Sequence, residues 1–276
     1  MAAPHSPPPA AYTCSGGQVN YANPPASTYA KDIPSGTYSN LTIAGLCEPA
    51  LNAVITVTGN VYVAPGGVLD AQGNPSTITV GDNVIAAPGS YLALGCLPNP
   101  GIHSTGHPCG TTLTQATLND VDPTTALSNI IVNGNVIATN ADLVSLYGTT
   151  VEGNVILIGS EGTASVAERA VAIPWAIKMN TIDGNLFVGD MTPIWIGVLD
   201  NQVGGNVVLF NVHITDGLPP NDDPSPTIFV ASNTIGWNLV CVGLAPAVSG
   251  GFTFEVNTVG GLDIGQCPLT GDIPVP

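Results

Sequence analysis

The chain has 276 residues, of which 44% are hydrophobic and only 8% are charged. Three Lys and Arg residues stand against 19 Asp and Glu residues, which gives a formal net charge of −16. Binding to nucleic acids and to anionic membrane surfaces depends on cationic side chains, so this balance excludes both classes of partner. No apolar run approaches membrane-spanning length, so membrane insertion is not expected.

The N-terminal segment, residues 1–30, is rich in Pro, Ala and Ser. This composition is typical of an extended tail, which Cys14 would pin to the remainder of the protein. Residues 31–276 carry one recurring unit and are predicted to form a single domain.

The recurring unit is centred on an Asn that usually follows Gly and precedes Val or Leu. Copies recur about every 20 residues, with longer intervals where loops are inserted, and this is the signature of a repeat architecture. The anchoring residues are Asn40, Asn60, Asn83, Asn135, Asn154, Asn185, Asn206 and Asn238, with Leu262 in a degenerate last copy.

Three residues before the anchor, the copies from Asn60 onward all carry Val or Ile. One residue after it, all but the last carry Val or Leu. Positions −3, −1, +1 and +3 share one face of a strand, so they predict a stacked apolar core. The sequence therefore predicts an all-β parallel β-solenoid.

The positions of opposite parity predict outward columns. Position −4 carries Thr in six copies, broken by Ile131 and Gln202, and the anchoring Asn residues would stack into a hydrogen-bonded ladder. Position +2 is apolar in every copy from Tyr62 to Ile264. Either the chain bends at Gly-Asn, or this strand is covered on both faces.

Two segments do not fit the repeat and are predicted to be loop insertions, at about 97–128 and 160–172. The second has the composition of one short helix.

The six cysteines are Cys14, Cys47, Cys96, Cys109, Cys241 and Cys267. Six cysteines allow fifteen pairings, but their distribution along the chain favours local pairs: 14 with 47, 96 with 109 and 241 with 267. An even number without a CxxC motif indicates disulfides in an oxidising compartment, so the protein is expected to be secreted, extracellular or associated with the cell wall.

The Cys14-Ser-Gly-Gly opening, the Gly-Asn-Val coils and the closing segments Asn233-Thr-Ile-Gly-Trp-Asn-Leu-Val-Cys241 and Asn257-Thr-Val-Gly-Gly-Leu-Asp-Ile-Gly-Gln-Cys267 resemble secreted actinobacterial Gly-Asn-Val repeat proteins. The chain departs from that pattern at Trp237, where the pattern has Gly, and at Leu262, where it has Asn. The resemblance implies a fold and a location and brings no catalytic residues. The coils are also similar to right-handed parallel β-helices, a fold used by polysaccharide lyases, galacturonases and surface adhesins.

Paired carboxylates are the catalytic groups of sugar hydrolases, and Asp183, Asp190, Asp200 and Asp216 fall within neighbouring coils. If the protein is an enzyme, these acids are the catalytic candidates. The Arg-x-Lys substrate clamp of galacturonases is missing, so the four acids are more simply solvated loop residues. Catalysis stays open on this basis, with the sequence leaning against it.

Metal ligands are weakly indicated at two places. His103 and His107 have suitable spacing, but the cysteine that follows them is expected in a disulfide. Asp222 and Asp223 are suited to calcium, the ion that such acidity would take, although turn chemistry explains them equally well. No cofactor is otherwise indicated.

Three tryptophans, Trp175, Trp195 and Trp237, are candidates for a sugar-stacking platform, with core or cap packing as the simpler interpretation. The Thr column also permits an ice-binding interpretation, which its interruptions weaken.

We expect first a non-catalytic extracellular solenoid that is used structurally or for surface binding. Its partner would be a cell-surface glycan or another copy of the protein, as in a filament. The alternatives are a carbohydrate-active hydrolase or lyase that uses Asp acids, and an ice-binding protein that uses the Thr column.

Overall fold

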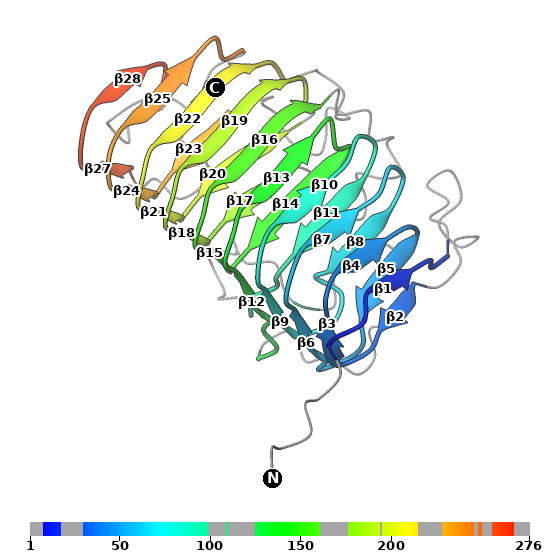
Figure 1. Ribbon diagram of the computed structural model, residues 1–276. Helices are drawn as coiled ribbons and strands as arrows, with labels where there is room; N and C mark the ends of the chain where they lie inside the picture. The colour runs from blue at the N-terminus through cyan, green and yellow to red at the C-terminus, as the bar shows by residue number, and fades with distance from the viewer. Residues whose placement is uncertain are drawn as a thin grey trace.

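The computed structural model describes residues 8–17, 30–98, 109, 125–160, 176–193, 195–214, 228–245, 248–249 and 256–267. Over these residues the chain forms strands and no helix, and the strands wind into three parallel sheets (Figure 1). The predicted all-β parallel solenoid is confirmed. Its right-handed winding stays a prediction, and the short helix expected at 160–172 lies almost entirely outside the described residues.

Sheet A has ten strands: β1 (Tyr12–Cys14), β4 (Leu41–Ile43), β7 (Val61–Val63), β10 (Val84–Ala86), β13 (Val136–Thr139), β16 (Val155–Ser160), β19 (Leu186–Met191), β22 (Val207–Val212), β25 (Leu239–Val242) and β28 (Asp263–Gly265). Sheet B has nine: β2 (Lys31–Ile33), β5 (Leu46–Pro49), β8 (Val68–Ala71), β11 (Tyr91–Leu94), β14 (Leu143–Tyr147), β17 (Ala176–Lys178), β20 (Ile196–Leu199), β23 (Ile228–Ala231) and β26 (Val248–Ser249).

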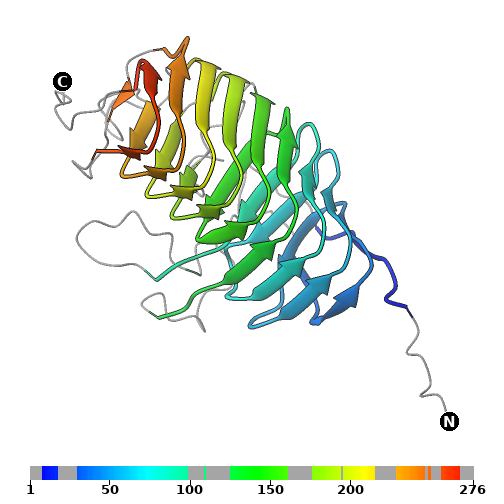
Figure 2. The same cartoon turned by 60° about the vertical axis from the view of Figure 1, so that its left-hand side comes forward.

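Sheet C has nine: β3 (Gly36–Tyr38), β6 (Val54–Val57), β9 (Thr77–Val80), β12 (Asn129–Val132), β15 (Thr149–Val151), β18 (Thr181–Ile182), β21 (Gln202–Val203), β24 (Thr234–Ile235) and β27 (Thr258–Val259). Each coil runs from sheet C through sheet A to sheet B. Successive coils stack from the blue end to the red end of the molecule (Figure 2). Ten strands spaced by about 4.8 Å make a rod about 43 Å long.

The Gly-Asn pair marks the corner between sheets C and A, so the first of the two alternatives for position +2 is correct. Position −3 faces inward from sheet C, positions +1 and +3 face inward from sheet A, and position +2 faces outward. The glycine allows neighbouring coils to approach each other. A Cβ atom at Gly153 would lie 2.5 Å from the backbone oxygen of Gly134 in the preceding coil.

The interior is filled by columns of aliphatic side chains, one residue per coil. The parallel register aligns Val57 with Val80, Val80 with Val132, and Val132 with Val151, and all four are buried. A cavity of about 10 Å³ lies among such side chains. It is apolar and about the size of one water molecule, so it offers no room for a ligand.

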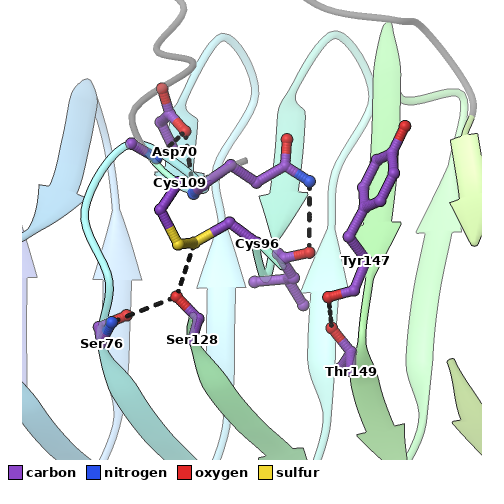
Figure 3. The surroundings of a disulfide bond; sticks show 10 residues. Asp70, Ser76, Cys96, Cys109, Ser128, Tyr147 and Thr149 are labelled. Atoms are coloured by element: carbon purple, nitrogen blue, oxygen red, sulfur yellow. Dashed lines mark hydrogen bonds between the residues drawn. A yellow bond between two sulfur atoms is a disulfide. The ribbon is translucent and has the colours of Figure 1, made fainter. Parts of the chain in front are cut away.

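The three disulfides are those expected from local pairing: Cys14–Cys47, Cys96–Cys109 and Cys241–Cys267. The first and third join consecutive coils at the two ends of the rod. In the second, shown in Figure 3, the Ser128 hydroxyl lies 3.1 Å from the Cys96 sulfur and accepts a hydrogen bond from the Ser76 backbone N–H.

The first strand lies inside the segment predicted as a tail. Tyr12–Cys14 pairs in register with Leu41–Ile43, so the solenoid begins before residue 31. The Pro-rich composition of residues 1–30 hid this short strand, which tertiary pairing and the Cys14–Cys47 bond hold in place.

Candidate functional site

The outer corner between sheets C and A carries the predicted Asn ladder. From Asn60 to Asn238, the side-chain oxygen of each Asn accepts a hydrogen bond from the backbone N–H of the next, at 2.9–3.2 Å. The Nδ2 of that next Asn donates to the same oxygen at 2.9–3.1 Å. At the last coil only the backbone N–H of Leu262 remains as donor. The ladder thus runs unbroken along the rod.

Beside this ladder, sheet A presents a line of outward apolar side chains, which we term the apolar track. These side chains are half-buried or exposed, one per coil, and stand in register: Tyr62, Ile85, Ile137, Ile156, Phe187, Val208, Val240 and Ile264. The Phe187 and Phe210 ring centroids lie 4.9 Å apart, and Phe210 occupies the space that a side chain at Gly189 would need.

Sheet C presents the predicted Thr column. The register aligns Thr56 with Thr79, Thr150 with Thr181 and Thr234 with Thr258, and Ile131 and Gln202 interrupt it. It is a single file, flanked at the corner by the exposed carboxylates of Glu152 and Asp183. The ice-binding interpretation therefore has one narrow column rather than a broad Thr face.

Sheet B differs from the other two because its outward side chains are buried. All residues of β5, β8, β11, β14, β17, β20 and β23 are buried. The long connections of the chain also begin or end at strands of this sheet: β1 to β2, β11 to β12, β16 to β17 and β22 to β23.

Two carboxyl groups lie on the outward side of sheet B in successive coils. Glu48 is 8% exposed and Asp70 is 2% exposed. Burial first, and the negative charges of Asp70 and Asp32 second, raise the pKa of Glu48 from 4.5 to about 7. The Asp70 Oδ1 accepts hydrogen bonds from the backbone N–H groups of Gln72 and Gly73 at 3.1 and 3.2 Å. The sequence reasoning missed this pair, because only the lateral register of β5 and β8 brings it together.

Further along sheet B, a buried lysine lies among aromatic rings. The Lys178 Nζ is 5.3 Å from the Trp195 ring centroid and 5.8 Å from that of Tyr147. Burial lowers the pKa of Lys178 to about 8, and the charge of Asp200 opposes this effect. Contacts of this kind compensate in part for the loss of hydration of the cation.

The acids predicted from sequence do not gather at one place. Asp183 follows β18 of sheet C, Asp190 lies in β19 of sheet A, and Asp200 follows β20 of sheet B, so the three occupy different corners. Asp190 accepts a hydrogen bond from Asn211 Nδ2 at 2.8 Å. Asp216 lies outside the described residues.

The tryptophans do not form one platform either. Trp195 packs on Phe229 beside sheet B, with ring centroids 5.4 Å apart, whereas Trp237 is 64% exposed at the corner of sheets C and A. Trp175 lies outside the described residues, as do the proposed metal ligands His103, His107, Asp222 and Asp223. Within the described ranges, no group of three or more His, Cys, Asp or Glu is arranged to hold a metal ion.

A second Asn ladder lies at the buried corner between sheets B and C. Asn180, Asn201, Asn233 and Asn257 each come five residues before the outer anchor, and each is buried. The Nδ2 of Asn201 donates to the oxygen of Asn233 at 2.9 Å and to the Ile177 carbonyl at 2.8 Å. The recurring Asn-Thr and Asn-Gln pairs at that spacing were the signal that sequence reasoning did not use.

The last strand of sheet A ends the core column with a carboxylate. Asp263 stands where the preceding coil has Leu239, and neither of its side-chain oxygens has a hydrogen-bond partner. Burial raises the pKa of Asp263. An inward-pointing charge on an edge strand opposes pairing with another chain.

No protein-family model, curated protein or solved structure matches this chain. Across the part of the chain that the structure describes, no helix combines the length and apolarity needed to cross a membrane.

Proposed function

We propose that this protein is a non-catalytic extracellular solenoid, a rigid disulfide-bonded rod that binds a surface through the outer face of sheet A. The observation that carries the proposal is the continuous register of that face, where the Asn ladder and the apolar track run side by side over the coils from β7 to β28. A repeated surface of this kind suits a repeated partner, such as a wall glycan, rather than a single small molecule.

The three disulfides support a location in an oxidising compartment, either free outside the cell or held at the cell wall. The resemblance to secreted actinobacterial repeat proteins also favours secretion. On the same basis we propose that the protein is of actinobacterial origin. Assembly of rods end to end into filaments is a less favoured role. The carboxylate of Asp263 opposes strand pairing at the end of the rod formed by β28.

Co-sedimentation tests the proposal. Oxidised protein is mixed with insoluble cell-wall preparations, cellulose and chitin, and the supernatant is assayed for remaining protein and for new reducing ends. We expect protein to leave the supernatant without release of sugar ends. Protein that stays in solution with every material, and that stays monomeric by light scattering, would overturn the proposal.

A second candidate function is acid catalysis on a carbohydrate, and the Glu48–Asp70 pair is the observation that favours it. A carboxyl group whose pKa is raised to about 7 beside a second carboxyl group supplies the two residue types that acid catalysis of glycoside hydrolysis uses. Both groups are buried, which weighs against access for a polymer. New reducing ends that disappear in Glu48→Gln would establish this function in place of the first.

A further inference from the structure

The two Asn ladders differ in how many of their amide hydrogens are used. In the inner ladder, Asn201 Nδ2 makes two hydrogen bonds, one to Asn233 and one to a backbone carbonyl. In the outer ladder, Asn154 Nδ2 makes one, to Asn135 at 3.0 Å. An amide nitrogen carries two hydrogens, so each such Asn of the outer ladder retains one unused donor.

The oxygens of the outer ladder are already saturated. The Asn154 Oδ1 accepts both the backbone N–H and the Nδ2 of Asn185, each at 2.9 Å. The backbone donor fixes which end of the amide is oxygen, because only an oxygen can accept from it. Six Asn residues, from Asn83 to Asn238, make a single Nδ2 hydrogen bond of this kind. The oxygen of Asn238 is the exception at the last coil, because it accepts only from the backbone N–H of Leu262. Between its end coils, the outer ladder is therefore a row of donors without free acceptors, spaced by about 4.8 Å.

The apolar track beside these donors carries no charge. No Asp, Glu, Lys or Arg stands at any track position in the described sheet A strands from β7 to β28. The flanks are acidic, with Asp82, Glu152 and Asp183 on the sheet C side of the Asn ladder and Asp190 at the opposite corner. A chain of net charge −16 with these flanks repels anionic polymers, so the complementary ligand is neutral.

The shape of the site favours an extended chain over a second copy of the protein. Eight coils make a strip about 34 Å long. Two outward side chains of one strand lie about 7 Å apart, and together with the width of the side chains themselves they make the strip about 10 Å wide. Its area of about 340 Å² is less than half of the roughly 800 Å² that each partner buries in a stable protein interface. A linear polymer lying along the axis needs no greater width.

From these features we infer that the outer Asn ladder and the apolar track together bind a neutral, linear, hydroxyl-rich glycan that lies parallel to the solenoid axis. Sugar hydroxyl and ring oxygens accept from the spare Nδ2 hydrogens. The apolar C–H faces of the sugar rings pack on the track, where Tyr62 and Phe187 supply aromatic rings and Phe210 lies against Phe187. This inference rests on the proposed function and specifies its ligand class and its site.

The test is isothermal titration calorimetry with cellohexaose, chitohexaose and xylohexaose, and with hexagalacturonate as the anionic counterpart. Ile156→Asp places a charge in the apolar track, and Thr150→Asp is the matched control, because it is also half-exposed and outward but lies on sheet C of the same coil. We expect at least one neutral hexasaccharide to bind, hexagalacturonate not to bind, and Ile156→Asp to weaken binding by about tenfold or more while Thr150→Asp changes it by less than about twofold.

The wall co-sedimentation described above, repeated with the same two variants, separates the two levels of failure. If walls retain both variants equally, or if neutral glycans bind Ile156→Asp as well as the parent protein, the site is not on the outer face of sheet A. That result overturns the inference and the face named in the proposed function, whereas wall binding by a non-catalytic rod would still stand. If hexagalacturonate binds and the neutral hexasaccharides do not, the ligand class is wrong. If neither walls nor sugars bind, and the protein shapes ice crystals instead, both the inference and the proposed function are overturned.

Discussion

Replacing Glu48 by Gln should increase stability above neutral pH and remove part of its pH dependence. Burial and the charges of Asp70 and Asp32 raise the pKa of Glu48 from 4.5 to about 7 in the folded protein. The folded state therefore keeps a proton that the unfolded state has released. As pH rises through this window, the unfolded state binds fewer protons than the folded state, and the free energy of unfolding falls.

The size of the effect follows from the shift. One pKa unit corresponds to about 1.4 kcal/mol, so the full shift is worth about 3 kcal/mol, and partial solvent screening reduces the expected gain to on the order of 2 kcal/mol at pH 8. At pH 4, where the carboxyl is protonated in both states, Glu48→Gln should be close to neutral. The assay is urea unfolding followed by far-UV circular dichroism at several pH values, under oxidising conditions.

Glu152→Gln is the control, because Glu152 is an exposed carboxylate at another corner of the coil. We expect its stability curve to follow that of the parent protein within about 0.5 kcal/mol at every pH. A Glu48→Gln protein that is no more stable than the parent at pH 8, or that gains equally at pH 4 and pH 8, would refute the reasoning.

Three further predictions concern the coil itself. A Cβ atom at Gly153 would lie 2.5 Å from a backbone oxygen of the preceding coil, so Gly153→Ala should lower the free energy of unfolding by about 1–3 kcal/mol in urea titrations. Asn201→Leu should cost about 2–5 kcal/mol in the same assay because it leaves several buried partners unsatisfied, whereas Asn206→Leu on the outer ladder should cost about 1 kcal/mol or less. Removing the Cys241–Cys267 bond, which closes a separation of 26 residues, should speed hydrogen exchange in β27 and β28 but not in β13, as mass spectrometry would show.

Each of these has a result that would count against it. Gly153→Ala with parental stability would mean that the coils separate easily at the corner. Equal losses for the two Asn variants would mean that burial of the inner ladder has no energetic consequence. Faster exchange spread evenly over the rod would mean that the solenoid unfolds as one unit rather than from its end.

Much of the fold was predictable because the repeat is local. The Val and Ile columns, the outer Asn ladder and the Thr column follow from residues at fixed positions relative to one Asn anchor in each copy, and the three disulfides follow from pairing neighbouring cysteines along the chain. Each coil repeats the same corner, so one alignment specifies the whole stack.

The candidate site was less predictable because its parts come from different sides of the coil. Asp183, Asp190 and Asp200 are close in sequence, yet each lies at a different corner of the coil. Conversely, Glu48 and Asp70 are one coil apart in sequence and meet only through the pairing of β5 with β8. Short strands of two to four residues give no outward or inward pattern strong enough to assign such groups to a side in advance.

The inner Asn ladder shows the same limit in another form. It begins only at Asn180, where the preceding residue Met179 has a φ of 56°. Earlier coils turn the corner with other residues, for example Gly148 before Thr149. A feature present in only part of the coils is hidden when all copies are aligned on a different anchor.

The most direct test of the binding face is nuclear magnetic resonance of the Asn side-chain amides in protein labelled with nitrogen-15 at Asn. Asn180, Asn201 and Asn233 of the inner ladder are an internal control, because they are buried and the Nδ2 of each already makes two hydrogen bonds. Titration with a neutral hexasaccharide should shift the Nδ2 resonances of the outer ladder, from Asn83 to Asn238, and leave those of the inner ladder in place. Shifts confined to other residues, or none at saturating sugar, would contradict the account.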